Sequence, residues 1–319
     1  MDRTGTTVSV VMPTYRKKGL LAETLSALRA QSYPHERIEV VVVDDCSGDD
    51  TWEFLKSLET PFSLVPVRHD VNRGRATARN SAIRKAEGDL VLFLDDDMRA
   101  DARLVEEHVG CHAAHADSVV IGNALTAPEL GASNVLRYLD TRGVHKLGAG
   151  ADVPARYFLT NNASLPREAL LAVGLFDETF RNYGFEDTEL AFRLERDAGL
   201  RFRYCPEALA YHIHHHSLRQ LVDKRYESAR GSLGHLLDRH PDRGRELKVD
   251  ALLPPGEADG GLLRARKLLT RAVTSRPATA IATALAGGPF LGPVTFRAID
   301  LLIAAAYRRG LADSVRAGS

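Results

Sequence analysis

Short apolar segments alternate with amphipathic ones along the first third of the chain. Residues 8–12 and 38–43 are runs rich in β-branched side chains, as expected of parallel strands that are buried on both faces. Between them, Leu21, Leu25 and Leu28 follow the i, i+4, i+7 spacing of an amphipathic helix. The alternation predicts repeated β-α-β units.

The same alternation continues to about residue 121. It predicts helix 51–58, strand 62–67, helix 75–86, strand 89–94, helix 101–115 and strand 118–121. Consecutive units with short connections form a twisted, doubly wound sheet. The predicted fold class is therefore α/β, with a Rossmann-like, mostly parallel central sheet flanked by helices. Ligands of such sheets bind at the carboxyl ends of the strands.

The second half of the chain has a different pattern. A mixed strand-and-loop stretch leads to helix 188–198 and a helical region at 217–240, and residues 252–261 have the composition of a flexible linker. Beyond it, 261–276 is basic and amphipathic, while 277–296 is uncharged but broken by proline and glycine. A membrane-spanning helix needs roughly 20 uninterrupted apolar residues. We therefore expect short helices that lie on a membrane or pack against the catalytic domain.

Charge and cysteine content narrow the class of protein. Lysine plus arginine and aspartate plus glutamate number 42 each, so the net charge is zero, which argues against a dedicated nucleic-acid binder. The three cysteines form no CxxC pair, so we expect no disulfide scaffold and a reducing, cytoplasmic setting. No signal-peptide pattern precedes the first strand.

Two acidic clusters follow buried strands. Asp95, Asp96 and Asp97 end the strand at 89–94, and adjacent carboxylates repel one another unless a cation or ligand neutralises them. Oxygen ligands of this kind suit Mg²⁺ or Mn²⁺, although a solvated acidic turn would have the same sequence. Asp44 and Asp45 end the strand at 38–43 and could accept hydrogen bonds from a nucleoside; capping of the next helix is the alternative.

A basic turn and an acidic helix start supply further candidates. Asn72 and Gly74 form a turn before a helix that carries Arg79, and a helix N-terminus with arginines is a natural site for a diphosphate. Glu186 and Asp187 begin another helix, where a carboxylate could act as general base or simply cap the helix.

The helix that begins at Glu186 also carries arginines, which set a condition on the base. Asp187 should not be held in a permanent salt bridge to Arg193 or Arg196 if it is to accept a proton.

Four histidines lie between positions 212 and 216. One neutral imidazole could complete a metal site begun by Asp97, and we choose His212, with His214 second. The cluster lacks the HExxH spacing typical of zinc.

In order, these motifs resemble family 2 glycosyltransferases of the GT-A fold over about residues 8–217. The segments are VSVVMPTYRK, IEVVVVDDCSGDDT, NRGRATARN, FLDDDM, TNNASLPREALLAVGLFDE, GFEDTELAFRL and the stretch from His212 to Ser217. The resemblance implies a nucleotide-sugar-dependent, inverting and metal-dependent enzyme. Asp187 resembles the catalytic base, with Glu186 beside it. Asp97, Asp95 and His212 resemble the ligands of Mn²⁺ or Mg²⁺.

The nucleotide-sugar contacts implied by the resemblance come from several segments. They are Pro13, Thr14, Tyr15, Asp44, Asp45, Asn72, Gly74, Arg79, Asp95, Asp96, Asn161 and Asn162. It implies a nucleotide-sugar-binding half at 1–120 and an acceptor-binding and catalytic half at 121–250. The different composition of the remaining residues predicts a helical, membrane-associated region at 251–319. A UDP- or dTDP-sugar is the expected donor, and a glycan, a lipid-linked glycan or a small molecule the expected acceptor. We expect peripheral contact of residues 261–310 with the inner face of the cell membrane.

Three rival functions remain to be weighed. A sugar-nucleotide pyrophosphorylase needs a glycine-rich phosphate loop after the first strand, where this chain has PTYRKKG. A nicotinamide dehydrogenase needs GxGxxG there. A catalytically silent, glycosyltransferase-like scaffold at the membrane is the non-enzyme alternative, and the intact acidic clusters disfavour it.

Overall fold

A computed structural model describes residues 5–256 and 259–318 and divides the chain into two compact units. We call Met1–Gly131, Asp140–Arg181 and Glu186–His215 the sheet unit. Ala132–Leu139, Asn182–Phe185 and His216–Ser319 form the helical unit. Neither of the boundaries expected at 120 and 250 separates these units, and a functional division at those positions stays a prediction.

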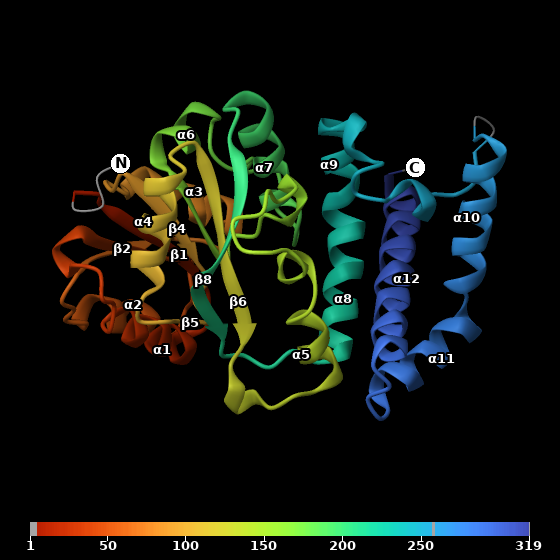
Figure 1. Cartoon of the computed structure of the whole chain (residues 1–319), viewed down its shortest axis with the longest axis horizontal. Coiled ribbons are helices and arrows are strands. Elements are labelled where there is room, and N and C mark those ends of the chain that lie inside the picture. Colours follow the sequence, from red (N-terminus) through yellow and green to blue (C-terminus); the bar gives the residue numbers. More distant parts are fainter. Residues whose placement is uncertain (1–4, 257–258, 319) are drawn as a thin grey trace. The chain divides into compact units, whose positions relative to one another are not determined.

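The sheet unit is built around eight strands (Figure 1). They are β1 (Val8–Thr14), β2 (Ile38–Asp44), β3 (Ser63–Arg68), β4 (Leu90–Leu94), β5 (Met98–Ala100), β6 (Ser118–Thr126), β7 (Asn162–Pro166) and β8 (Arg201–His212). Their order in the sheet is β3-β2-β1-β4-β7-β6-β8-β5. The strands β3, β2, β1 and β4 are parallel, as the alternation predicted.

The second half of the sheet is mixed. β7 is antiparallel to both β4 and β6, and the short β5 is antiparallel to the end of β8. The hydrophobic pattern did not predict these pairings, because they depend on contacts between segments far apart in sequence. The expected α/β class with a mostly parallel central sheet is confirmed.

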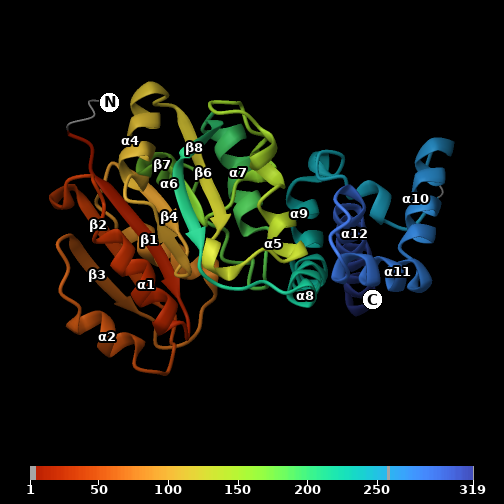
Figure 2. The ribbon, with the colours of Figure 1, turned by 60° about the horizontal axis from the view of Figure 1, so that its bottom comes forward.

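Helices cover both faces of this sheet (Figure 2). They are α1 (Lys18–Leu28), α2 (Thr51–Ser57), α3 (Arg75–Lys85), α4 (Leu104–Ala114), α6 (Arg167–Ala172) and α7 (Glu186–Asp197). Leu25 of α1, Leu55 of α2 and Val105 of α4 share one buried cluster with alternate residues of β1 and β2. Ile83 of α3 is buried outside this cluster, and α3 contacts β1 and β2, so α3 covers the opposite face.

The helical unit contains the rest of the chain. Its helices are α5 (Asn134–Leu139), α8 (Leu218–Ser228), α9 (Gly234–Arg239), α10 (Gly261–Val273), α11 (Arg276–Gly287) and α12 (Pro293–Gly318). Their core joins Val135, Leu221, Ala298, Ile299 and Leu302. The 26-residue α12 was not predicted. None of the described helices combines the length and the apolar character that a membrane span requires.

The stretch expected to be a flexible linker contains an ordered contact. Asp259 accepts hydrogen bonds from the Gly256 N–H at 2.6 Å and from the Lys267 ammonium at 2.7 Å. Residues 257–258 of this stretch lie outside the described residues.

Candidate active site

Three neighbouring strands bring the predicted nucleotide-binding residues to one edge of the sheet. Thr14 and Asp44 are paired at the ends of β1 and β2, and β4 ends just before Asp95. The Thr14 hydroxyl donates to an Asp96 oxygen at 2.8 Å, and the Asp45 N–H donates to the Thr14 carbonyl at 3.0 Å. The structure thus brings together the residues of both acidic clusters, as the doubly wound pattern predicted.

Asp44 keeps one carboxylate oxygen available at this edge. Its side chain is buried, and its Oδ1 accepts a hydrogen bond from the Ser47 N–H at 2.9 Å. Its Oδ2 has no hydrogen-bond partner within the described part of the chain, and Arg68 Nε lies 3.8 Å away. A buried acceptor of this kind gains stability when a ligand donates to it.

Asp45 has a different environment. Its carboxylate accepts hydrogen bonds from the N–H groups of Arg73 and Gly74, both at 2.9 Å, and lies 2.7 Å from His69 Nδ1. The Asn72 side chain donates to the Asp45 carbonyl at 3.2 Å. Gly74 has φ of +84°, which a residue with a side chain adopts only at a cost. These contacts shape the turn that begins α3.

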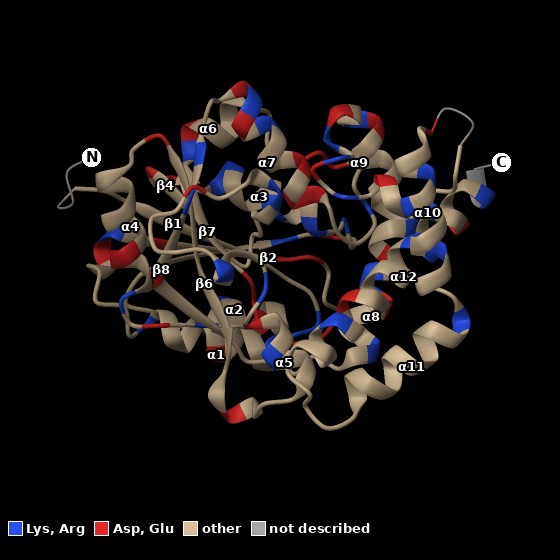
Figure 3. Ribbon diagram, turned by 45° about the vertical axis from the view of Figure 1, so that its right-hand side comes forward, with Lys and Arg blue, Asp and Glu red and all other residues tan. Residues whose placement is uncertain are grey.

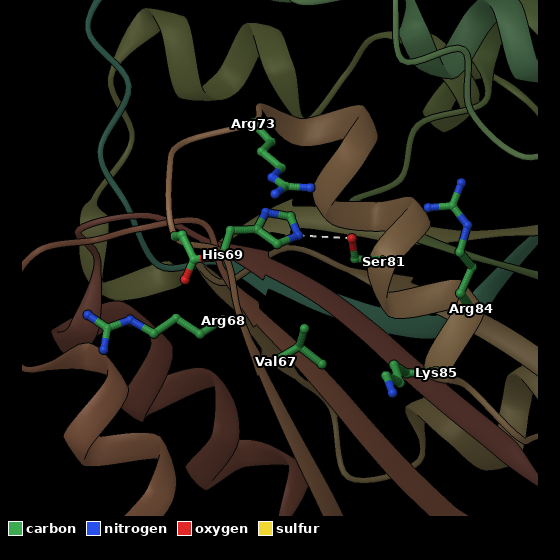
Figure 4. A pocket seen from close by; sticks show the side chains of 8 residues that line it. Val67, Arg68, His69, Arg73, Ser81, Arg84 and Lys85 are labelled. Atoms are coloured by element: carbon green, nitrogen blue, oxygen red, sulfur yellow. Dashed lines mark hydrogen bonds between the residues drawn. The ribbon is translucent and has the colours of Figure 1, made fainter.

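A basic cavity of about 320 Å³ lies beside this turn (Figure 4). It is lined by Val67, Arg68, His69, Asp70, Arg73, Ser81, Arg84 and Lys85. His69 Nε2 lies 2.9 Å from the Ser81 hydroxyl, so this histidine links Asp45 to α3. None of the three aspartates of the 95–97 cluster lines the cavity.

The Lys17 ammonium lies between two carboxylates of the 95–97 cluster. Its Nζ is 2.9 Å from both Asp96 Oδ1 and Asp97 Oδ2. Burial raises the pKa of Asp96 to about 6, against the opposing effect of Lys17. Burial would also raise the pKa of Asp97, but Lys17, His212 and His214 outweigh it and hold that pKa below its usual range. Sequence reasoning missed Lys17, although its place just after the first strand was a signal.

Strand pairing places His212 next to Asp97. Met98 pairs with His212 across β5 and β8, and the Ile213 N–H donates to the Asp97 carbonyl at 3.1 Å. The Asn161 amide nitrogen lies 3.2 Å from His212 Nε2. Two of the three predicted metal ligands are therefore neighbours.

No group of three or more His, Cys, Asp or Glu side chains within residues 5–256 and 259–318 has the arrangement of a metal site. However, the Lys17 ammonium shows that a cation fits between Asp96 and Asp97. Magnesium-type sites commonly use one or two protein carboxylates and take further ligands from phosphate. The residues present fit a divalent ion that is shared with a diphosphate.

Arg79 connects the acidic cluster to the start of α7. It is 4% exposed, and its guanidinium lies 3.3 Å from Asp95, 3.1 Å from Glu186 and 3.4 Å from Asp187. A buried arginine among three carboxylates acts as their shared counter-ion, because an unpaired buried charge is costly. The nucleotide contact expected of Arg79 stays a prediction, and its contacts within the chain give it a positioning role.

Asp187 is partly buried, with 15% of its side chain exposed, and is held in a defined orientation. Its carboxylate accepts hydrogen bonds from the Thr160 N–H and hydroxyl at 3.2–3.3 Å. Burial, reinforced by Glu186 and Asp95, raises the pKa of Asp187 to about 7 although Arg79 opposes the shift. A carboxyl group with such a pKa can exchange a proton near neutral pH.

Among the described residues, the salt-bridge partner of Asp187 is Arg79, at 3.4 Å, and not Arg193 or Arg196. Arg193 pairs with Glu189 at 2.6 Å, and Arg196 pairs with Asp197 at 2.7 Å.

Asn161 and Asn162 were both predicted to contact the nucleotide sugar, but they have different surroundings in the structure. Asn161 lies beside His212, whereas Asn162 is buried and donates to the Ala208 carbonyl at 2.8 Å. The side-chain amide oxygen of Asn162 lies 2.8 Å from His108 Nε2. Burial lowers the pKa of that histidine to about 4. Asn162 thus holds β7 to its neighbours, and Asn161 is the asparagine at the candidate site.

A GT-A-like sheet with paired acidic clusters at its carboxyl edge defines a nucleotide-sugar glycosyltransferase, and comparison with known proteins agrees. Residues 9–171 match the model of glycosyl transferase family 2. The chain belongs to this family and is a glycosyltransferase. Family membership decides against the pyrophosphorylase and dehydrogenase alternatives.

Two relatives show how far the similarity extends. An uncharacterized glycosyltransferase, YfnE of Bacillus subtilis (strain 168), is 30% identical over 280 residues, covering 73% of this chain and 70% of its own. A validoxylamine A glucosyltransferase of Streptomyces hygroscopicus subsp. limoneus is 32% identical over 215 residues, covering 59% of this chain but 47% of its own. The similarity to the second relative spans about half of that protein.

Two solved structures share the fold. The mannosyltransferase PcManGT of Pyrobaculum calidifontis, in complex with GDP-Man and Mn²⁺, has a TM-score of 0.65 at 22% identity over 97% of this chain and 88% of its own. S. aureus TarS 1–349, in complex with UDP, has a TM-score of 0.57 at 19% identity over 98% and 92%.

Proposed function

We propose that the protein transfers a sugar from a nucleoside-diphosphate donor to an acceptor hydroxyl with inversion, and that Asp187 is the general base. The observation that carries the proposal is the cluster around Arg79. It holds Asp187 close to Asp95 of the acidic edge, and Asp187 is partly buried with a pKa of about 7. A UDP- or dTDP-sugar is the proposed donor.

For the nucleoside, we propose contacts with Asp44 and Thr14, flanked by Pro13 and Tyr15. The Asp44 Oδ2 atom suits a donor group of a base or ribose because it lacks a hydrogen bond inside the described chain. Asp95, which is partly exposed, faces the same edge and suits a ribose hydroxyl. Asp45, Asn72 and Gly74 would act by holding the turn in place.

Asp97 and His212 are the proposed protein ligands of a divalent ion, Mn²⁺ or Mg²⁺. Bound there and shared with the diphosphate, the ion would neutralise charge on the leaving group. The remaining chemistry falls to the chain itself. Asp187 would take the acceptor proton while the acceptor oxygen bonds to the anomeric carbon and the bond from that carbon to the diphosphate oxygen breaks. One displacement from the opposite face inverts the configuration.

An assay of the purified protein with UDP-, dTDP- and GDP-sugars, with and without Mn²⁺, tests the proposal. Metal-dependent turnover of one donor is expected, and NMR of the product should show the inverted anomeric configuration. Turnover with retained configuration would contradict the mechanism, and absence of both binding and turnover across the panel would contradict the function.

Replacing Lys17 by methionine is expected to tighten Mn²⁺ binding about tenfold, an effect of roughly 1.4 kcal/mol. The ammonium now lies between Asp96 and Asp97, so it competes with any cation for those oxygens. Isothermal titration or Mn²⁺ EPR without donor measures the affinity. Lys18→Met is the matched control, because Lys18 pairs with Asp50 instead. Unchanged or weaker Mn²⁺ binding by Lys17→Met would show that the ammonium and the metal do not share the site.

The proposed acceptor is a hydroxyl group of a glycan, a lipid-linked glycan or a small molecule. We further propose that the enzyme is cytoplasmic. Its residues 261–310 would contact the inner face of the cell membrane peripherally.

A further inference from the structure

The helix α10 exposes most of its leucines together with its arginines and buries one lysine. A surface helix normally buries its apolar face and exposes its charged one. Here Lys267 is only 7% exposed and pairs with Asp259 at 2.7 Å, whereas Leu262 is 80% and Leu269 64% exposed. Leu262, Leu269 and Val273 fall on one side of the helix at i, i+7 and i+11. The helical unit therefore buries the Lys267 side of α10 and presents leucines outward.

The next segment continues this arrangement. The helix α11 buries the small side chains Ala282 and Ala286 and leaves Ile281 64% exposed. Eight of the thirteen large apolar side chains that are exposed among the described residues fall between positions 262 and 294. They are Leu262, Leu268, Leu269, Val273, Ile281, Phe290, Leu291 and Val294, which we call the 262–294 face. Exposed apolar residues concentrated in this way mark an interaction surface.

The segment that forms this face contains basic but no acidic side chains. No aspartate or glutamate occurs from Gly260 to Ile299, although the whole chain has zero net charge. The exposed cations of this stretch are Arg264, Arg266, Arg271, Arg276 and Arg297. In Figure 3, α10 carries basic positions, and most of α11 is without charge. The segment thus combines exposed apolar side chains with exposed arginines.

We propose that the 262–294 face binds the surface of a membrane rich in anionic phospholipid. Leucine and phenylalanine side chains would enter the boundary between headgroups and acyl chains, and the arginines would contact lipid phosphates. A second copy of the chain is a poorer occupant, because symmetric pairing would bring arginine-rich surfaces of like charge together. This inference specifies the peripheral contact proposed above and does not depend on glycosyl transfer.

Vesicle flotation with the full-length protein tests the inference. We expect binding to vesicles of phosphatidylcholine with 30% phosphatidylglycerol, little binding to pure phosphatidylcholine, and release by high salt. The double variant Leu262→Gln/Leu269→Gln should lower the partition coefficient at least about tenfold, because burial of each leucine contributes strongly to insertion. Arg266→Gln should lower it roughly fivefold, because Arg266 is exposed and lies one helical turn from Leu262 on the leucine side of α10.

Leu171→Gln is the matched control, since Leu171 is also an exposed leucine, at 43%, but lies outside the face. Absence of vesicle binding, equal binding to both vesicle types, or unchanged binding by the leucine variant would overturn the inference. A dimer in light scattering that Leu262→Gln/Leu269→Gln dissolves would assign the face to a second copy instead. Donor hydrolysis by each variant, measured without vesicles, should equal wild type, which separates this inference from the proposed catalytic function.

Discussion

The Asp187→Asn variant is expected to lose about 10²- to 10⁴-fold in kcat, the range that a general base contributes, while nucleotide affinity stays unchanged. Asparagine keeps the shape of the side chain and its contact with Thr160, but it cannot accept the acceptor proton. Transfer assays at saturating donor, together with calorimetric titration of the nucleotide, separate the two effects. Asp197→Asn on the same helix is the control, because Asp197 is exposed and pairs with Arg196. Equal activity of the two variants would remove Asp187 from the catalytic role.

The same group determines the expected pH dependence. The pKa of Asp187 is raised to about 7, and the base must be unprotonated to act. Activity of the wild type should therefore fall as the pH drops below about 7 and level off above it. The residual activity of Asp187→Asn should lack this acidic limb, and a limb that persisted in the variant would assign it to another group.

The Asp97→Ala variant is expected to lose Mn²⁺-dependent turnover by about 10²- to 10³-fold, corresponding to several kcal/mol of lost charge stabilisation. Asp97 is the carboxylate that strand pairing sets beside His212 and that also contacts Lys17. Its loss should weaken Mn²⁺ binding as well, which titration of the metal measures independently of turnover.

Asp101→Asn is the control for this experiment, because its carboxylate accepts a hydrogen bond from the Arg103 N–H beyond β5. Circular dichroism and thermal melting of both variants check that the fold is kept. Full metal-dependent activity in Asp97→Ala would contradict the proposed metal site.

The correct predictions from sequence concern local patterns and the parallel half of the sheet. Runs such as 38–43 become buried strands because nearly every side chain in them is apolar. Once β1, β2 and β4 are parallel neighbours, their ends must meet, so Thr14, Asp44 and Asp95 come to one edge. The order of motifs then indicated the family, which the comparisons confirm.

The missed features depend on contacts between distant segments. Arg79 was predicted as a nucleotide contact, which stays a prediction, but the placement of its guanidinium among Asp95, Glu186 and Asp187 was not predicted. Asn161 and Asn162 are adjacent in sequence, yet Asn161 lies beside His212 and Asn162 forms hydrogen bonds inside the sheet. Neither outcome is encoded in local spacing.

The sequence by itself determined the parallel half of the sheet with its helices, the acidic edge and the family, because periodicity and motif order are local properties. The tertiary structure alone decided which charges neutralise one another. It placed Lys17 between Asp96 and Asp97, buried Asp187 enough to raise its pKa, and turned the leucines of α10 outward while burying Lys267. The physical reason is that burial and electrostatic pairing depend on distances in space, which separation along the chain does not specify.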